Sequence, residues 1–490
     1  MSLARNSMLL VVGRSVASLA RLVVNLLVAR HFGEALQLTA EYQKIWLYFN
    51  TLFQVFLFGI PASMYYFHPR LEGEERRSFV NQSHTILFLL GGVFALCLLG
   101  LAPVAARFYG VPNLPLYYSW FAFYGWTMVA SSQLEAALNL AGRFQLLAAL
   151  LIGEALLFSV AVLAPLKAGL DLHGTVIAIT VLGCLRFLAL HVLLTKRAPE
   201  LAWSRWRLPL AATGRQLAWT LPITMTTLVA YLAAFLDKNI VATWFKEGGV
   251  YAVYQIGAME VPFVSVLVGS VTAVMLPRLS RLQHEGKTGE ICDLLARSVE
   301  GLAWIVFPLF TLLMVVADLV FVALLGESYR ASAVPFRLYL LLFPLRIMFY
   351  GQILNTLGKA RWVFWSALGD LALNAALSLY LVRVIGMPGP ALATVLATFV
   401  EIGMFLWLLK ATLGEPLGRI FRWQGLRLPT LFALLPVAGA LAGRWLGGAN
   451  ILLALVLSLM GYGLLLLPVL ARPEARRSLG TLFQGLRREK

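Results

Sequence analysis

The stretch from Gly13 to Arg30, GRSVASLARLVVNLLVAR, has the length and apolar content of a membrane-crossing helix, yet Arg14, Arg21 and Asn25 lie inside it. At 100° per residue, these three positions fall within about 60° of one another on a helix. Each arginine near the middle of a bilayer costs about 2.5–3.5 kcal/mol on insertion scales, so the stripe is expected to face a wet cavity or paired partners. Because arginine can bind phosphate oxygens in a bidentate manner, such a stripe suits a phosphorylated ligand.

Three further charged residues lie in other apolar stretches of the first half: Glu135, Glu154 and Arg186. The first half thus holds three cations against two anions. Internal ion pairing is one interpretation, and a surplus cation that suits an anionic ligand is the other. Polar residues on one face of the second apolar stretch extend the polar wall: Gln43, Asn50 and Gln54. The predicted substrate-binding residues are Arg14, Arg21, Asn25, Asn50, Arg186 and Arg346.

The apolar stretches of the second half have the opposite charge balance. Their acids are Asp237, Glu260, Asp318, Asp370 and Glu401, and they outnumber Lys238 and Arg346. Carboxylates inside membrane spans are candidate proton or sodium sites, since they gain or lose charge as access alternates. Pairing with a neighbour, as between Asp237 and Lys238, is an equally good interpretation of any single acid.

Motifs of enzymes and of metal sites are missing from the sequence. It contains no HExxH, no GxxxxGK[ST] phosphate loop and no GxSxG elbow, and its three cysteines show no CxxC spacing. We therefore predict a protein that is not an enzyme, with no catalytic residues, no metal site and no cofactor other than Na⁺ or H⁺ as a coupling ion.

Composition indicates which elements must position these residues. Of the 490 residues, 60% are hydrophobic and only 13% are charged, which is typical of a polytopic membrane protein. Apolar runs of the length that a bilayer requires recur along the whole chain. The sequence predicts an all-α fold of about fourteen transmembrane helices, at residues 7–30, 44–67, 82–106, 116–140, 145–167, 173–195, 216–243, 250–275, 299–325, 334–357, 362–385, 389–411, 428–447 and 450–470.

The net charge of +17 follows membrane topology rather than nucleic-acid binding. With the amino terminus inside, roughly 26 of the 40 Lys and Arg residues fall in inner loops and tails. Both termini are therefore predicted to be cytoplasmic.

The two halves of the chain contain similar motifs at similar spacing, which indicates an internal repeat. NLAGR, ending at Arg143, and NTLGK, ending at Lys359, close the fourth and tenth spans 216 residues apart, and Glu154 and Asp370 have the same offset. Because six spans are an even number, the two copies enter the membrane in the same direction, as a parallel repeat. The predicted domains are an N-terminal six-helix bundle (1–195), a cytoplasmic linker (196–215), a C-terminal six-helix bundle (216–411), helices 13 and 14 (412–470) and a basic cytoplasmic tail (471–490).

Several stretches, in this order and with fourteen spans, resemble the multidrug/oligosaccharidyl-lipid/polysaccharide superfamily, and within it the polysaccharide transporters such as O-antigen flippases. They are VARHFG, FGIPASMYYF, LPITMTTLVAYLAAFLDKNIV, GVYAVYQIGAME, LPRLSRL and LNAALSLYLVRVIGMPGPALATVLAT. The resemblance implies two six-helix bundles in a V-shape in the bacterial inner membrane. It also implies transport of isoprenyl-diphosphate-linked sugars between leaflets by alternating access, with a polysaccharide polymerase and other assembly proteins as possible partners.

Some members of this superfamily resemble sodium-coupled carriers, in which helices seven, eleven and twelve hold the cation. Carried over by position, that resemblance implies Asp237, Asn374 and Thr394 as ligands, and Glu260 and Asp370 complete the predicted ion-coupling set. Ser378 stands one turn beyond Asn374, where a second acid would strengthen a sodium site. Coupling to protons or to the membrane potential therefore stays open.

Alternative functions remain compatible with the sequence. A lipid II flippase is the nearest, and a drug/cation antiporter of the same superfamily is the next. A membrane enzyme of glycan assembly is disfavoured, because every predicted outer connection is short.

Overall fold

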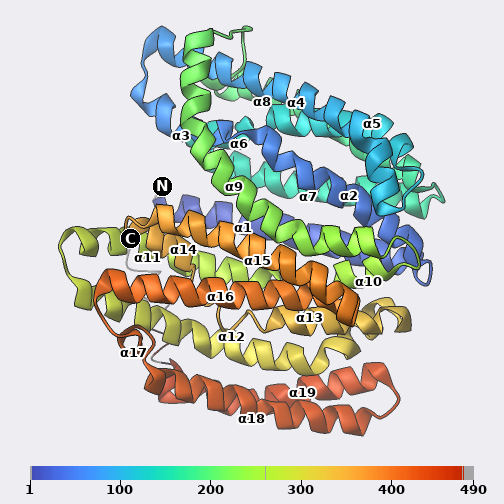
Figure 1. The fold of residues 1–490 in the computed structure, drawn as a ribbon, viewed down its shortest axis with the longest axis vertical. Helices are drawn as coiled ribbons and strands as arrows, with labels where there is room; N and C mark the ends of the chain where they lie inside the picture. Colours follow the sequence, from blue (N-terminus) through green and yellow to red (C-terminus); the bar gives the residue numbers. More distant parts are fainter. Residues whose placement is uncertain (1–2, 260, 477, 479, 481–490) are drawn as a thin grey trace. The chain divides into compact units, whose positions relative to one another are not determined.

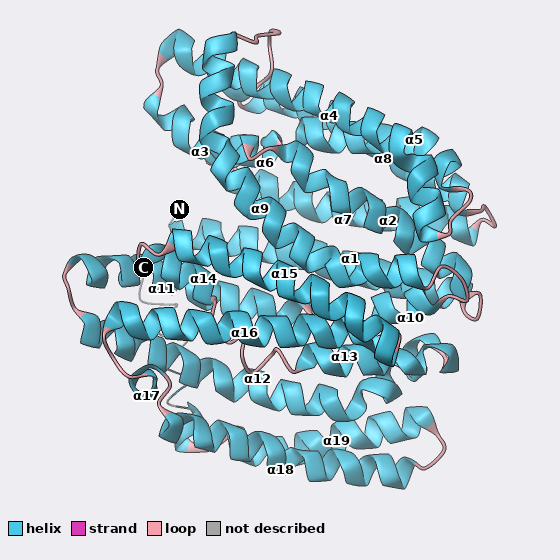
Figure 2. Cartoon of the chain, viewed as in Figure 1, coloured by secondary structure: helices cyan, strands magenta, loops and turns pink. Residues whose placement is uncertain are grey.

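The structure is a computed structural model that describes residues 3–259, 261–476, 478 and 480, and the described residues form helices, turns and loops without a strand (Figures 1 and 2). Contacts divide the chain into two compact units, Met1–Ala252 and Val253–Lys490. The division falls inside one short helix, α10 (Val250–Gly257).

The first unit contains the longest helices of the N-terminal half. In chain order its elements are α1 (Leu3–Phe32), α2 (Leu36–Leu57), α3 (Ile60–Phe67), η1 (His68–Arg70), α4 (Gly73–Tyr109), α5 (Leu114–Ser131), α6 (Gln133–Leu140), α7 (Phe144–Lys167), α8 (Leu172–Arg197), η2 (Pro199–Leu201) and α9 (Leu210–Trp244). α1 packs along α7, and α5 packs between α4 and α8. The Cβ that Gly13 lacks would lie 3.3 Å from the Cα atom of Ala148, so a glycine at this position lets α1 and α7 approach closely.

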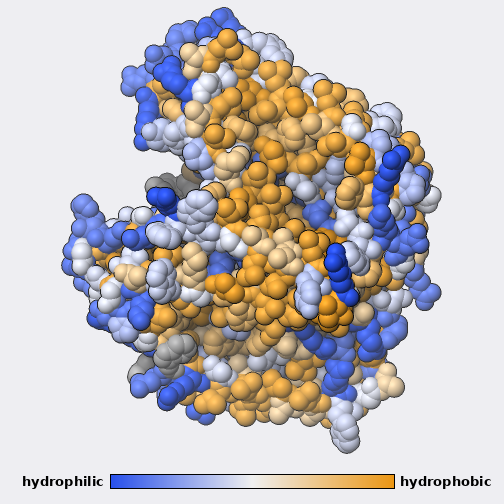
Figure 3. Space-filling model, in the orientation of Figure 1, coloured by the Kyte–Doolittle hydropathy of each residue, from blue (hydrophilic) through white to orange (hydrophobic). Residues whose placement is uncertain are grey.

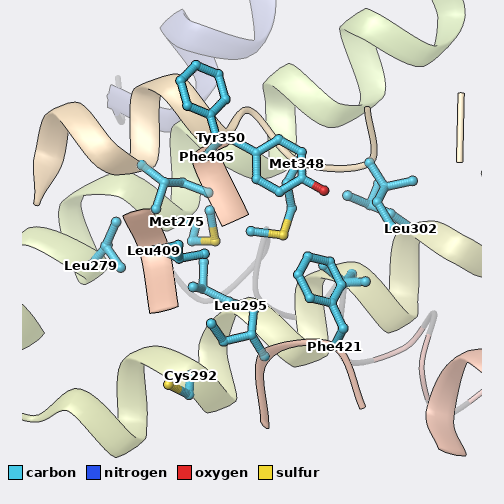
Figure 4. Packing of buried hydrophobic residues seen from close by; sticks show 14 of the residues in the cluster. Met275, Leu279, Cys292, Leu295, Leu302, Met348, Tyr350, Phe405, Leu409 and Phe421 are labelled. Atoms are coloured by element: carbon cyan, nitrogen blue, oxygen red, sulfur yellow. The ribbon is translucent and has the colours of Figure 1, made fainter. Parts of the chain in front are cut away.

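The second unit continues from α10 with a further set of long helices. They are α11 (Pro262–His284), α12 (Thr288–Leu325), η3 (Glu327–Ser332), α13 (Ala333–Leu340), α14 (Tyr350–Thr356), α15 (Ala360–Ile385), α16 (Pro388–Leu413), α17 (Leu417–Ile420), α18 (Trp423–Gly447) and α19 (Ile451–Leu470). α15 pairs with α16, and α18 pairs with α19 and packs on α12. Figure 4 shows part of the apolar core of this unit, where Met275, Leu295, Met348 and Phe405 meet.

Twelve helical segments of the described chain are long and apolar enough to cross a membrane. They match twelve of the fourteen predicted spans, which confirms an all-α, multi-pass membrane protein. Figure 3 shows apolar side chains along the middle of the helices and hydrophilic ones gathered towards the helix ends on the face in view. The spans predicted at 116–140 and 334–357 are not among the twelve, and each of them is interrupted.

Local hydrogen bonding accounts for the two interruptions. At the first, the hydroxyl groups of Ser131 and Ser132 donate to the backbone carbonyls of Thr127 and Val129, which competes with the helical pattern, and α5 gives way to α6. At the second, Pro344 has no backbone N–H, and the chain from Leu341 to Leu345 forms tight turns before α14 begins. Apolar composition around Pro344 hides the second break from a reading of the sequence, whereas the first break lies in a short polar stretch, SSQLE.

The second and eighth predicted spans are interrupted as well. α2 ends at Leu57, and Phe58 and Gly59 both adopt left-handed backbone conformations (φ 46° and 61°) before α3 begins at Ile60, with Pro61 in its first turn. The Cβ that Gly59 lacks would lie 3.3 Å from side-chain atoms of two residues of α9, which leaves little room for any other residue. In the eighth span α10 ends at Gly257 and α11 begins at Pro262. The interruptions thus occupy corresponding spans of the two predicted copies.

The contact-defined boundary differs from the predicted domain boundary. The prediction places the seventh span in the second bundle, but this span, α9, belongs to the first unit. Near the start of α9 the amide of Gln216 donates to Ser63 Oγ (2.8 Å) and to Ser83 Oγ (2.9 Å), and it accepts from Gln82 (2.7 Å). Near the end of α9 the amide of Asn239 bonds Thr51 Oγ1 (3.1 Å). Polar contacts at both ends of α9 therefore attach this helix to the first unit, although the repeat assigns it to the second copy.

Candidate functional site

The polar stripe of α1 lies on one of three distinct faces of this helix. Gly13 and Val24 are buried on the face that packs on α7. Leu19 and Val23, which are 48% and 46% exposed, form an apolar face suited to lipid. Arg14, Ser18 and Arg21 are exposed on a third face, and Asn25 is half-buried beside it. Since lipid cannot solvate a guanidinium group cheaply, the third face must meet water, a partner or a ligand.

Arg14 is paired with an acid from a distant part of the chain. Its guanidinium Nε donates to Glu135 Oε1 at 3.1 Å, and its Nη2 contacts the same oxygen. Glu135 lies on α6, just beyond the interruption of the fourth span. Both side chains are well exposed, so the pair is held weakly and can be opened by a competing anion.

Arg186 is paired as well, in a more buried setting. On α8 its Nε lies 2.9 Å from Glu154 Oε2 of α7, and its Nη1 donates to Ser131 Oγ at 2.5 Å. The side chains of Arg186 and Glu154 are only 20% and 26% exposed. A pair in this position depends on both partners, because loss of either leaves a poorly hydrated charge.

Arg21 is the arginine that remains. Its side chain makes no ion pair and no hydrogen bond within the described part of the chain; the amide of Asn25 donates only to the backbone carbonyl of Arg21 (3.2 Å). The charges of Arg21, Arg186 and Glu154 all act on the hydroxyl of Tyr124, so these groups share one region of the unit. We call Arg14, Arg21, Arg186, Glu135 and Glu154 the arginine cluster.

The structure does not join every predicted residue to this cluster. Asn50 is half-buried on α2. Among the described residues, no hydrogen bond connects it to an arginine of the cluster. Gln43 is buried, and its Oε1 has no hydrogen-bond partner in the described chain. Arg346, the sixth predicted substrate-binding residue, lies in the second unit.

Arg346 belongs to a second group of charges, which has more acids than cations. It lies in the non-helical segment between α13 and α14, where Pro344 interrupts the span. Its charge acts on Asp370 of α15 and on Glu401 of α16, and these two carboxylates also act on each other. Both carboxylates are half-buried, and Asp370 Oδ1 has no hydrogen-bond partner among the described residues. We call these three residues the acidic cluster.

Two of the predicted sodium ligands, Asn374 and Thr394, are in contact within the second unit. Thr394 Oγ1 and Ser378 Oγ donate to the same acceptor, Asn374 Oδ1, at 3.3 and 3.0 Å, and Asn374 and Ser378 are buried. Asp237 belongs to the first unit, where it is buried with Lys238 Nζ 3.4 Å from its carboxylate. Glu260 lies outside the described residues.

Sequence reasoning missed Lys44 and the three partners of Asp318, which the structure makes prominent. Lys44 is fully buried in α2, and its ammonium group donates to the backbone carbonyls of Tyr109 (2.7 Å) and Lys246 (3.0 Å). The carbonyl of Tyr109 is the last of α4, where a cation offsets the partial negative charge of a helix terminus, and Lys246 lies two residues beyond the end of α9. Asp318 of α12 is surrounded by guanidinium groups of Arg330, Arg337 and Arg444. Only the intramembrane position of Lys44 could have signalled its role.

Comparison with known proteins agrees with this architecture. A family model described as a polysaccharide biosynthesis protein matches residues 72–334, which is more than half of the chain. The fold is similar to that of the lipid II flippase MurJ in an inward closed conformation, with a TM-score of 0.71 and 16% identity, covering 94% of this chain and 98% of that chain.

Two multidrug transporters are similar at a lower level. An inward-facing multidrug resistance MATE family transporter of the MOP superfamily has a TM-score of 0.61 and 14% identity, covering 81% of this chain and 95% of that chain. The MATE multidrug transporter DinF-BH has a TM-score of 0.60 and 16% identity, covering 84% of this chain and 96% of that chain. A search of curated protein sequences found no match. At these identities the solved structures show a common fold.

Proposed function

Since the chain belongs to the polysaccharide biosynthesis protein family, within the multidrug/oligosaccharidyl-lipid/polysaccharide superfamily, we propose that it is a flippase for isoprenyl-diphosphate-linked oligosaccharide. The cargo would be an O-antigen or exopolysaccharide repeat unit, moved from the inner to the outer leaflet by alternating access. Its diphosphate-sugar head is anionic and strongly hydrated, so it needs a cationic, wet route, whereas its lipid tail can stay in the bilayer.

The observation that supports this proposal most directly is the unpaired Arg21. Because no acid of the described chain pairs with it, Arg21 carries an unbalanced positive charge inside a membrane helix, where such a charge is costly. A bound anion would supply the missing charge, and a guanidinium group can present two parallel N–H donors to phosphate oxygens. Arg21 is therefore assigned as the primary contact of the diphosphate.

The two ion pairs of the arginine cluster have different roles in this proposal. The Arg14–Glu135 pair is exposed, so the diphosphate can compete with Glu135 and recruit Arg14 as a second ligand. The Arg186–Glu154 pair is more buried and keeps α7 and α8 in register beside the site. Arg21 thus binds the cargo directly, Arg14 can exchange Glu135 for the cargo, and Arg186 has a structural role.

The acidic cluster would supply the coupling. Among the described residues, Arg346 is the one cation whose charge acts on Asp370 and Glu401, and a proton or Na⁺ bound there would neutralise the excess negative charge. The Asn374–Ser378–Thr394 group offers neutral oxygens nearby on α15 and α16. The anion would bind in one unit, and the coupling cation in the other.

A direct test is transport in proteoliposomes. An isoprenyl diphosphate bearing a fluorescently labelled saccharide is incorporated into both leaflets, and a membrane-impermeant quencher reports the fraction that reaches the outside. We expect wild-type protein to make the inner pool accessible, and Arg21→Gln to weaken apparent cargo affinity by about 2 kcal/mol, roughly 30-fold. Arg21→Lys should recover only part of the loss, because lysine keeps the charge but not the bidentate geometry.

The matched control is Arg30→Gln, which removes an exposed arginine from the same helix, away from the polar stripe. An equal loss in Arg21→Gln and Arg30→Gln would contradict the assignment of Arg21. Transport of a peptide-bearing lipid II analogue in preference to the plain oligosaccharide would identify a lipid II flippase instead. Transport of a cationic dye with no flipping of either lipid would identify an antiporter.

A further inference from the structure

The segment that joins η2 to α9 has a fixed structure although only its last residue, Leu210, is helical. We call residues 202–210, AWSRWRLPL, the strap. On α4, Asn81 Oδ1 accepts hydrogen bonds from the backbone N–H groups of Ser204 (2.8 Å) and Arg205 (3.2 Å). One turn further along α4, Thr85 Oγ1 accepts from the N–H of Arg207 (3.3 Å). Because Asn81 and Thr85 are buried, these bonds hold the strap firmly on the first unit.

Aromatic contacts fix the same segment from one side. The ring of Trp203 is stacked with His84 and tilted against Phe88, two further residues of α4. Trp206 lies edge-on to Phe88 and to Trp203. The bonds at Asn81 and Thr85 and these ring contacts follow one face of α4 over two turns, so the strap runs along that helix.

Large apolar side chains of the strap nevertheless remain uncovered. Trp206 is 62% exposed, Leu208 is 42% exposed and Leu210 is 83% exposed. They alternate with Arg205 and Arg207, which are also exposed. The strap therefore exposes apolar and basic side chains at adjacent positions. We call Trp206, Leu208 and Leu210 its apolar edge, and Arg205 and Arg207 its basic edge.

The position of the strap along α4 places these edges at the border of the bilayer. Phe88 lies near the start of the apolar span predicted at 82–106, on the side that the charge distribution predicts to be cytoplasmic. Tryptophan is enriched at this interface, where one end of its ring is apolar and the other wet. The flanking region 196–215 has one acid, Glu200, and five basic residues: Lys196, Arg197, Arg205, Arg207 and Arg215.

We propose that the strap is a docking surface for anionic phospholipids of the cytoplasmic leaflet. Trp206, Leu208 and Leu210 enter the boundary between headgroups and acyl chains, and Arg205 and Arg207 bind the lipid phosphates. Charge complementarity selects this occupant, since the cytoplasmic leaflet carries a negative surface potential. The inference depends on the predicted topology and not on which cargo the protein moves.

The test compares lipid binding by full-length variants. Native mass spectrometry of protein incubated with a mixture of phosphatidylglycerol and phosphatidylcholine gives the preference for the anionic lipid. At about fivefold per arginine, Arg205→Gln/Arg207→Gln should lower this preference by roughly 25-fold. The matched control, Arg281→Gln/Lys287→Gln, removes two exposed basic residues from another predicted cytoplasmic loop. An equal loss in both double variants, or no loss in the first, would overturn the proposal.

A second measurement locates the apolar edge without removing a charge. In nanodiscs of phosphatidylglycerol with brominated acyl chains, the fluorescence of Trp206 should be quenched. The fraction of the total tryptophan fluorescence that is quenched should therefore be smaller in Trp206→Phe than in the wild type. Trp445→Phe, which removes a tryptophan that is 81% exposed on α18, is the comparison for general quenching. Equal quenching of Trp206 by brominated phosphatidylcholine alone would contradict selection by charge. Displacement of phosphatidylglycerol only by isoprenyl phosphate would show that the strap binds the cargo lipid instead.

Discussion

The arginine cluster of the first unit and the acidic cluster of the second unit have opposite charge balance. The first contains three arginines and two glutamates, and its unmatched residue is Arg21. The second contains one arginine and two carboxylates, and its unmatched charge is negative. Both occur beside an interruption of a membrane span, the fourth and the tenth. Corresponding positions of two similar units thus suit ligands of opposite sign, an anion in one and a cation in the other.

If the two clusters have separate roles, the largest effect is expected from removing a carboxylate of the acidic cluster. Asp370→Asn or Glu401→Gln should abolish the response of transport to an ion gradient or potential, while cargo affinity stays near wild type. Each charge removed from the transported set lowers the driving force by about 2.3 kcal/mol at 100 mV, roughly 50-fold in the steady-state distribution. Proteoliposomes with an imposed potential measure this ratio.

Arg361→Gln is the control for that experiment, because it alters an exposed charge at the start of α15 outside the acidic cluster. If Asp370→Asn weakens cargo binding as strongly as Arg21→Gln does, the assignment of cargo binding to the arginine cluster and of coupling to the acidic cluster is wrong.

The second prediction compares the two ion pairs inside the arginine cluster. Glu154→Gln leaves the more buried Arg186 without its acid and should lower the free energy of unfolding by about 2 kcal/mol. Glu135→Gln breaks an exposed pair and should cost less than about 1 kcal/mol, while it frees Arg14 and strengthens cargo binding. Thermal unfolding in detergent gives the stabilities. Equal destabilisation by both changes would mean that burial does not separate the pairs.

A third prediction sharpens the cation site of the second unit. Ser378 is fully buried and donates to Asn374 Oδ1, so Ser378→Asp places a carboxylate beside the oxygens of Asn374 and Thr394. Sodium at ten times its dissociation constant would then stabilise the variant by about 1.4 kcal/mol. The difference between melting temperatures in NaCl and KCl measures this effect, with Ser378→Asn as the uncharged control. A sodium shift as large in wild type or in Ser378→Asn would contradict it.

The smallest effect is expected for an ion pair outside the membrane, which shows what a hydrated pair contributes. A hydrogen bond from Lys287 holds the pKa of Glu285 below its ordinary value in the loop after α11. Stability from such a carboxylate is present above its unfolded pKa and is lost as the pH falls through the folded pKa. Glu285→Gln should therefore leave the melting temperature unchanged between pH 7 and pH 5. A shift as large as that of Glu154→Gln would show that hydration does not weaken these pairs.

The sequence predicted the membrane architecture because composition and periodicity report it directly. A bilayer demands long apolar helices, and twelve of the predicted spans match helices of the right length. Breaks were harder to see, because the tight turns at Pro344 lie in an apolar stretch, and because Ser131 and Ser132 interrupt the helix through hydroxyl bonds that composition does not reveal. The assignment of α9 to the first unit could not be read from the repeat, since it depends on how Gln216 and Asn239 find partners on other helices.

By itself the sequence determined which charges must lie in the membrane and that the two halves differ in sign, because insertion cost makes each such residue conspicuous. Only the tertiary structure decided which of them are matched. Arg14 and Glu135 are 121 residues apart, and their pairing follows from the packing of helices rather than from any local pattern. Within the described residues, the same packing leaves Arg21 without an acid and gathers Asp370 and Glu401 around Arg346. Charge content is a property of the chain, whereas charge balance at a site is a property of the fold.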